Sequence, residues 1–124
     1  MSIFVPPPGG PPVTLSQGDI TTIINNAAAG TTPTSIVFNV RSGPGRFAPT
    51  LNLSANIGGA TVVSATLQES SDGGTTYVTA ANGGTLDFVA KPDQQFTVIP
   101  GKLYKLAVGT LTGGTGLTVN AAVS

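Results

Sequence analysis

Two of the five acidic residues of the chain, Glu69 and Asp72, lie three positions apart in the stretch LQESSDGGTTYVTA, beside two adjacent glycines. Two carboxylates at this spacing next to a loop could act as a general acid and a general base, or could bind a cation. The same residues could instead only turn the chain, because Asp-Gly is a preferred sequence of tight hairpins. The neighbouring segments distinguish these interpretations.

The segments around the acidic pair favour a hairpin. VVSATLQE precedes it and TTYVTA follows it, and each has the composition of a strand, so SSDGGT is the connection between them. We therefore expect Asp72 to accept hydrogen bonds from backbone amides of the turn, with a cation contact as the less favoured alternative. We expect Glu69 to be solvated at the end of its strand, although Asp87 or Asp93 could approach it in the fold.

The composition argues against most kinds of enzyme. The chain contains no His and no Cys, so it has no imidazole for proton transfer near neutral pH and no thiolate for catalysis or for a zinc site. The sequence therefore predicts a protein that is not an enzyme, with no catalytic residue, no cofactor, no metal site and no small-molecule substrate.

Charged residues make up only 8% of the chain, and five basic residues balance five acidic ones. The usual share in soluble domains is about 25%, and a protein with so little charge has weak protection against association. This favours a protein that lives bound to a larger assembly. The basic residues form no continuous stripe, which argues against nucleic acid as a partner; they are Arg41, Arg46, Lys91, Lys102 and Lys105.

The hydropathy pattern predicts no membrane partner. No apolar run approaches the roughly 20 residues that span a bilayer, and the start of the sequence, MSIFVPPPGGPPV, lacks the pattern of a signal peptide. We expect a soluble protein that is made in the cytoplasm.

Residues 1–13 hold five of the ten prolines and are expected to form an extended arm outside the core, because proline lacks the N–H that a sheet requires. A disordered terminus is the alternative. The apolar residues at the tip favour an arm that anchors on a neighbouring subunit. The candidate partner-binding residues of the arm are Ile3, Phe4, Val5, Pro6, Pro7 and Pro8.

Residues 19–29 allow two interpretations. Ile20, Ile23 and Ile24 recur at helical spacing, an N-cap residue is available, and Gly30 could end a short helix. The β-branched Ile and Thr residues argue instead for a strand at the edge of a sheet. The helix is slightly favoured, and the sequence divides into an arm with this element (1–30) and a β-domain (31–124).

From residue 33 onward the pattern indicates strands. Leu117, Val119, Ala121 and Val123 alternate with polar or small residues, as in a half-buried strand. About eight such short runs with turns between them predict an all-β protein, an antiparallel β-sandwich of immunoglobulin-like or jelly-roll-like type. The runs are SIVFNV, TLNLSA, VVSATLQE, TYVTA, TLDFVA, QFTVI, LYKLAV and LTVNAAV.

Two glycine clusters, GPGRF at 43–47 and GTLTGGTG at 109–116, are expected to be turns. Neither has the Lys-Ser/Thr ending of a phosphate-binding loop. In the first, Arg46 beside Phe47 is a candidate partner-binding pair, since arginine and aromatic residues are frequent anchors of interfaces. An ordinary loop is the alternative.

Residues 57–124 carry a family resemblance. IGGATVVSATLQESSDGGTTYVTA and IPGKLYKLAVGTLTGGTGLTVNAAV resemble small β-sandwich structural proteins of tailed bacteriophages, in which a GGATV entry leads through a strand to a DGGTTW-type hairpin. Tyr77 stands where the family has its aromatic residue, and VVSATLQ is a few residues longer than the typical run. Members of the family are capsid decoration or cement proteins, and related sandwiches are head fibres or tail components.

The resemblance implies a virion structural protein without a catalytic site. It would bind the outer capsid surface, bridge neighbouring capsomers and stabilise the shell, with the major capsid protein or other virion proteins as partners and a homotrimer as the oligomer. Its location would be the surface of the virion. The alternative is a head-fibre, tail or adhesive module that binds carbohydrate or a host surface, although the chain has no Trp and only two Tyr residues for such contacts.

Overall fold

The computed structural model describes residues 3–4, 12–41 and 49–124, and those residues form strands, turns and loops without any helix. The strands are β1 (Ile3–Phe4), β2 (Val13–Leu15), β3 (Ile20–Ala27), β4 (Phe38–Val40), β5 (Thr50–Asn56), β6 (Val62–Ser70), β7 (Val78–Thr79), β8 (Leu86–Asp87), β9 (Asp93–Thr97), β10 (Leu103–Thr112) and β11 (Leu117–Val123). Each of the eight runs expected from the sequence overlaps one of the strands from β4 to β11.

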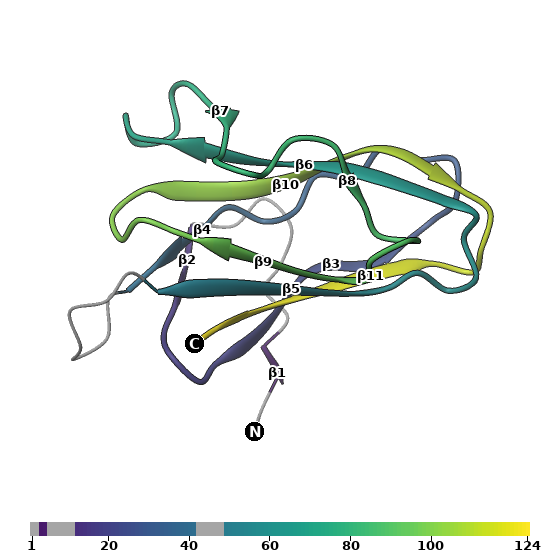
Figure 1. Ribbon diagram of the computed structural model, residues 1–124, viewed down its shortest axis with the longest axis horizontal. Coiled ribbons are helices and arrows are strands. Elements are labelled where there is room, and N and C mark those ends of the chain that lie inside the picture. The colour runs from purple at the N-terminus through teal and green to yellow at the C-terminus, as the bar shows by residue number, and fades with distance from the viewer. Residues whose placement is uncertain (1–2, 5–11, 42–48) are drawn as a thin grey trace.

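The strands form two sheets that pack face to face (Figure 1). Sheet A has the order β1-β3-β11-β5-β9, and sheet B has the order β2-β4-β10-β6-β7, with β8 also paired to β6. Most pairs are antiparallel, whereas β1 pairs with β3 and β2 pairs with β4 in parallel. The all-β sandwich predicted from the sequence is therefore confirmed.

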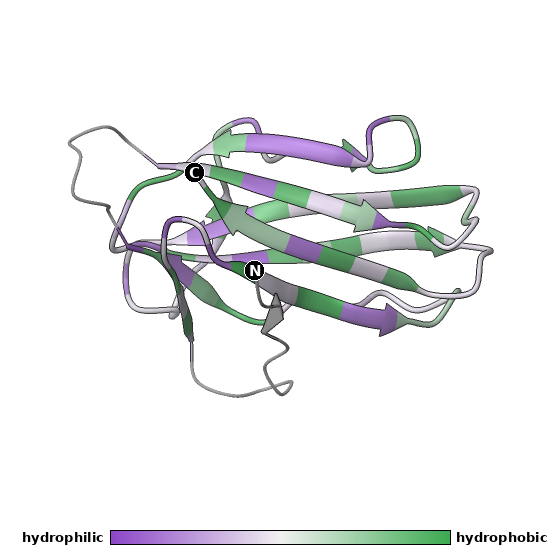
Figure 2. Ribbon diagram, turned by 90° about the horizontal axis from the view of Figure 1, so that it is seen from below, coloured by the Kyte–Doolittle hydropathy of each residue, from purple (hydrophilic) through white to green (hydrophobic). Residues whose placement is uncertain are grey.

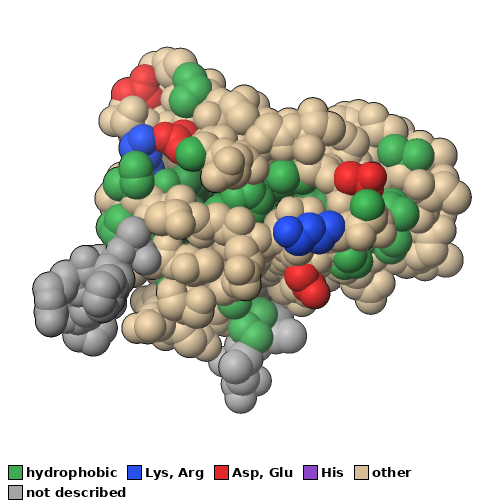
Figure 3. All heavy atoms as spheres, viewed as in Figure 1, with side chains coloured by type: hydrophobic (Ala, Val, Ile, Leu, Met, Phe, Trp, Pro, Cys, Tyr) green, Lys and Arg blue, Asp and Glu red, His purple; other side chains and the backbone are tan. Residues whose placement is uncertain are grey.

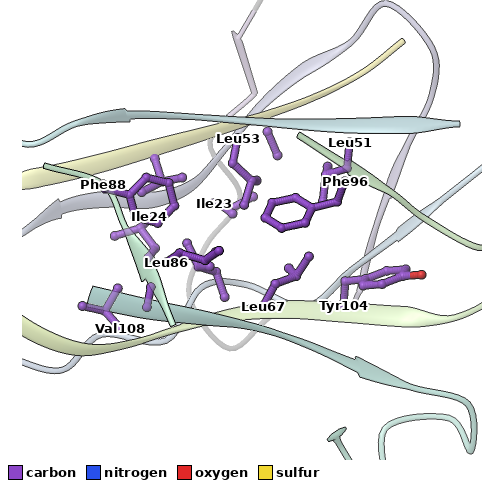
Figure 4. Close-up of a cluster of buried hydrophobic side chains, with 14 of the residues drawn as sticks. Ile23, Ile24, Leu51, Leu53, Leu67, Leu86, Phe88, Phe96, Tyr104 and Val108 are labelled. Carbon is purple, nitrogen blue, oxygen red and sulfur yellow. The ribbon is translucent and has the colours of Figure 1, made fainter. Parts of the chain in front are cut away.

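The core lies between the sheets and is filled by the inward-facing residue of each alternating pair (Figure 4). Leu117, Val119, Ala121 and Val123 are all buried, as the alternation predicts. On the facing sheet Tyr104 and Leu106 are buried in the same way. Aliphatic and aromatic side chains from both sheets therefore meet in one hydrophobic core, whose burial is the main favourable term in folding.

The helix expected over residues 19–29 is wrong, because Ile20–Ala27 form strand β3, which pairs with β11. The register between the two strands shifts twice, between Leu117 and Val119 and again between Val119 and Asn120. Extra residues in a bulged strand disturb the two-residue alternation. Ile23 and Ile24 are consequently both buried although they are adjacent in the sequence, which explains why their spacing resembles that of a helix.

The proline-rich arm contributes more to the sheets than the sequence predicts. The backbone of Ile3–Phe4 pairs with Ile20 and Thr21 at the edge of sheet A. Val13 begins strand β2, its N–H donates to Val37 O at 3.0 Å, and Leu15 at the end of this strand is fully buried. Strands β2 and β3 thus place the segment from residue 13 onward in the two sheets.

At one end of the sandwich, three segments approach each other so closely that only glycine fits. A Cβ atom on Gly58 would lie 2.5 Å from Gly116 O, and one on Gly116 would lie 2.0 Å from Asn26 Oδ1. The N–H of Thr115 donates to Gly58 O at 3.0 Å. The turn expected over 109–116 is confirmed only for residues 113–116, because residues 109–112 form the end of strand β10.

Candidate functional site

The β6–β7 connection is a hairpin, as the sequence predicts, with Gln68 opposite Thr79 and Glu69 opposite Val78. The Asp72 carboxylate accepts hydrogen bonds from the Thr76 N–H at 2.9 Å and from the Ser70 hydroxyl at 2.7 Å. Ser70 Oγ in turn accepts from the Gly74 N–H at 2.9 Å. The positive backbone angles of the turn belong to Gly73 and Gly74. Asp72 therefore organises the turn, as expected.

The hydrogen bond from the Thr76 amide, followed by that from the Ser70 hydroxyl, lowers the pKa of the Asp72 carboxyl below its ordinary value of 3.8. Hydrogen bonds to the ionised form favour that form. The carboxylate is thus already engaged by the turn. Among the described residues, no group of three His, Cys, Asp or Glu side chains is placed to hold a metal ion.

Glu69 is not the solvated residue that the sequence predicts. Its carboxylate forms an ion pair with the Lys102 ammonium, and the two side chains are only 16% and 26% exposed. The hydrogen bond to Glu69 raises the pKa of Lys102 above its ordinary value of 10.5. The pair joins the end of β6 to the turn before β10, a relationship that no local sequence signal indicates.

Tyr104 supports the same turn from inside the core. Its hydroxyl oxygen accepts a hydrogen bond from the Ile99 N–H at 2.8 Å, and the ring lies beside Phe38 with 6.1 Å between ring centroids. Burial raises the pKa of the Tyr104 phenol above its ordinary value of 10.0. The Lys102 N–H donates to Ile99 O at 3.3 Å and closes the turn, so Ile99 is held in a defined position.

Two exposed apolar residues lie on the segments that this ion pair joins. Val78 is 58% exposed and stands opposite Glu69 in the β6–β7 pair, and Ile99 is 52% exposed and precedes Lys102 in the turn. We call these four residues, Val78, Ile99, Glu69 and Lys102, the end patch. Hydrophobic, basic and acidic side chains gather in the upper left of Figure 3, over the end of the molecule that carries β7. The end patch is the candidate interaction site.

The outer face of sheet B offers little for recognition. The Lys105 ammonium lies 4.0 Å from the centroid of the Tyr77 ring, a cation–π contact that occupies one face of the ring. On the same sheet, Asn39 Oδ1 is buried and has no hydrogen-bond partner among the described residues. Asn39 stands opposite Leu103 in the β4–β10 pair.

The candidate partner-binding residues from the sequence are mostly outside the described part of the chain. The backbone of Ile3 and Phe4 forms β1, as stated above. Val5, Pro6, Pro7, Pro8, Arg46 and Phe47 lie outside the described residues. Of the end patch, the sequence indicated only Glu69 as a candidate for chemistry. The exposure of Val78 and Ile99 could not be read from the alternating pattern of the runs TYVTA and QFTVI, and Ile99 lies in the turn after β9.

The sequence left open whether Asp87 approaches Glu69, but the structure gives Asp87 another role. Its carboxylate accepts hydrogen bonds from the N–H groups of Val89 and Ala90 at 3.0 and 3.1 Å, and so it caps the turn after β8. Asp93 begins strand β9 opposite Ser54. Four acidic residues thus have four different places in the fold: Asp72 in a turn, Glu69 in an ion pair, Asp87 in a cap and Asp93 at the start of an edge strand.

Comparison of the chain with protein-family models, with curated proteins and with solved structures finds no match. Among the described residues, the structure has no helix long and apolar enough to cross a membrane.

Proposed function

We propose that this protein is a structural component of a virion, a capsid decoration protein that binds the outer surface of the shell and stabilises it without performing chemistry. The observation that carries the proposal is the end patch, where two exposed apolar side chains stand beside a partly buried ion pair. The β-sandwich fold and the sequence resemblance to phage structural proteins support the same proposal.

The end patch has the composition of an interface centre. Val78 and Ile99 each leave more than half of their surface in water, and fully burying such a side chain contributes about 1.5 to 3 kcal/mol. Glu69 and Lys102 beside them already satisfy each other, so a partner could cover this surface without leaving an unpaired charge. Contacts of this kind combine an apolar centre with a polar rim.

The roles of the acidic residues support a protein without catalysis. A general acid or base must be free to reach a substrate proton. Asp72, Glu69 and Asp87 are each engaged by groups of the protein itself, in a turn, an ion pair and a cap. The residues that could have formed a catalytic pair therefore stabilise the fold.

The arm supplies a second contact in this proposal. Its tip is apolar and its spacer is proline-rich, and within one chain the tip is held to β3 by only the two residue pairs of β1. In this proposal the tip leaves β3 and reaches a neighbouring subunit at low entropic cost. Copies bound through a patch and an arm would bridge two capsomers. Binding that favours the closed shell stabilises it by mass action, even when each copy contributes little.

The two tyrosines give little support to the alternative, an adhesive module that binds carbohydrate. Sugar-binding sites usually present an open aromatic face. Tyr104 is only 1% exposed, and the Tyr77 ring is contacted by Lys105. Tyr104 therefore offers no ring face to a sugar, and one face of the Tyr77 ring is already covered.

Co-sedimentation with capsids that lack the protein tests the proposal. The purified chain should pellet with intact capsids in a saturable manner and should remain in the supernatant without them. An added soluble polysaccharide should not compete. Failure to bind capsids at any concentration, together with binding to host surface glycans, would move the assignment to the adhesive module.

A further inference from the structure

Strand β9 (Asp93–Thr97) is an open edge of the sandwich. It is the last strand of sheet A, and Figure 2 shows it as the outermost, hydrophilic strand with no ribbon beyond it. The strands at the ends of the two sheets, β1, β2, β7 and β9, have two, three, two and five residues. Among the described strands that end the two sheets, β9 is therefore the longest.

The hydrogen bonds to β5 fix which backbone groups of β9 are free. The Ala55 N–H donates to Pro92 O, and the Val98 N–H donates to Pro49 O. Because such pairs alternate along an antiparallel ladder, residues 94 and 96 also point their backbone groups toward β5. The N–H and C=O groups of Asp93, Gln95 and Thr97 point outward, and none has a partner among the described residues.

The arrangement of these residues is self-complementary. If two copies pair antiparallel about a two-fold axis at Gln95, each Asp93 faces Thr97 of the other copy, and all outward N–H and C=O groups find partners. A parallel pairing in register would set Asp93 against Asp93, which is unfavourable. We propose that two copies of this chain associate through β9 in this antiparallel register, which joins their A sheets into one continuous sheet.

The zero net charge of the chain permits this contact between two copies, and the short length of β9 keeps it specific but weak. The chain has a formal net charge of zero, so no long-range repulsion opposes the approach of two copies. Pro92 and Pro100 lie on either side of the strand and confine the pairing to a few residues, as is common for natural edge strands. The contact therefore forms chiefly where copies are concentrated, as on the surface of an assembly.

An extended segment of a different protein is the other occupant that could fit this edge. Such a segment would need free backbone groups but no two-fold symmetry at Gln95. Experiments that require residue 95 of one copy to lie opposite residue 95 of another copy therefore distinguish a second copy of this chain from a segment of a different protein.

A single introduced cysteine tests the symmetry directly, because the chain contains no Cys. Residues that exchange both backbone hydrogen bonds have Cα atoms about 5.5 Å apart, which is within the range of a disulfide. Gln95→Cys should therefore form a covalent dimer under mild oxidation. Asn52→Cys is the matched control, since Asn52 is the partner of Gln95 on β5 and lies one strand away from the edge. It should stay monomeric.

Charge variants provide a second test in solution. Gln95→Lys and Gln95→Glu each place like charges across the axis and should weaken self-association, measured by sedimentation equilibrium, about two- to five-fold. An equimolar mixture of the two should regain or exceed the association of the parent chain, whereas the same pair of changes at Asn52 should have no effect. The proposal is overturned if Gln95→Cys gives no covalent dimer, or if association is absent or unchanged by charge at residue 95.

Discussion

Glu69 and Lys102, which are 33 positions apart in the sequence, form an ion pair that fixes the turn before β10 against the end of β6. Glu69 also stands opposite Val78, and Lys102 closes the turn that begins at Ile99. The ion pair therefore joins the two backbone segments that carry the exposed apolar side chains, so these segments do not have to be brought together when a partner binds. Such preorganisation lowers the cost of association.

The end patch is expected to carry capsid binding. Val78→Ser together with Ile99→Ser should weaken binding to capsids at least about ten-fold, because two apolar contacts are lost. Folding should be retained, since both side chains are more than half exposed. Co-sedimentation over a range of protein concentrations gives the affinity.

Val62 and Val89 provide the matched control for this variant. They are the other large apolar residues with substantial exposure in the described part, at 43% and 37%. Their neighbours differ from those of the end patch, since Val62 stands opposite Thr112 at the far end of β10. Val62→Ser with Val89→Ser should bind normally, and equal losses in both double variants would argue against a localised site.

The arm is expected to add to binding and not to folding. Deletion of residues 2–11 removes the two-residue strand β1 but should leave the sandwich folded, because strand β2 begins only at Val13. It should weaken attachment to capsids. A deletion extended to residue 13 would also remove the hydrogen bond from Val13 to Val37 and should reduce stability. Thermal unfolding and co-sedimentation separate the two effects, and unchanged capsid affinity of the shorter deletion would contradict the role of the arm.

Gly58 and Gly59, at the end of the sandwich where Gly58 approaches Gly116, should differ sharply in how much stability is lost when a side chain is added. Gly58 and Gly59 both have positive φ angles, of 61° and 85°, but only a Cβ on Gly58 meets neighbouring atoms. Gly59→Ala should lower the free energy of unfolding by about 1 kcal/mol. Gly58→Ala should lower it by about 2 to 4 kcal/mol, because the clash with Gly116 O is added. If urea unfolding gave similar losses of unfolding free energy for both variants, the close approach of Gly58 to Gly116 would be absent.

The turn at Asp72 should contribute an acid-sensitive part of the stability. Since the folded-state pKa of Asp72 lies below 3.8, the stabilisation is fully present above that value. As the pH falls further, the unfolded chain takes up the proton first, and the stabilisation is lost through the folded-state pKa. Asp72→Asn keeps an acceptor oxygen without titrating, so its difference from the parent chain in free energy of unfolding should change as the pH falls through and below 3.8.

If Asp72→Asn followed the same pH dependence as the parent chain, the hydrogen bonds to the turn would not distinguish the two protonation states of Asp72.

The strands with a regular alternation could be predicted from the sequence, and the bulged strand could not. In β11 every second residue from Leu117 to Val123 is buried, and the pattern is visible without the structure. In β3 the two register shifts against β11 bring Ile23 and Ile24 into the core together. The sequence does not show where a partner strand forces a bulge, and so the same residues fit a helix.

The candidate site could be predicted only in part, for a related reason. The role of Asp72 depends on neighbours within four positions, which the sequence places beside it. The role of Glu69 depends on Lys102, and the pairing of β6 with β10 decides that contact. The exposure of Val78 follows from the position of β7 at the edge of sheet B, and that order is a property of the whole fold.

The heat stability of capsids with and without this protein tests the central claim most directly. Capsids that lack the protein should assemble normally but release their contents at a lower temperature than complete ones. Adding back the parent chain should restore the higher temperature, whereas the Val78→Ser, Ile99→Ser variant should not. Capsids that are equally robust without the protein, yet fail to attach to host cells, would contradict a stabilising role and favour the adhesive one.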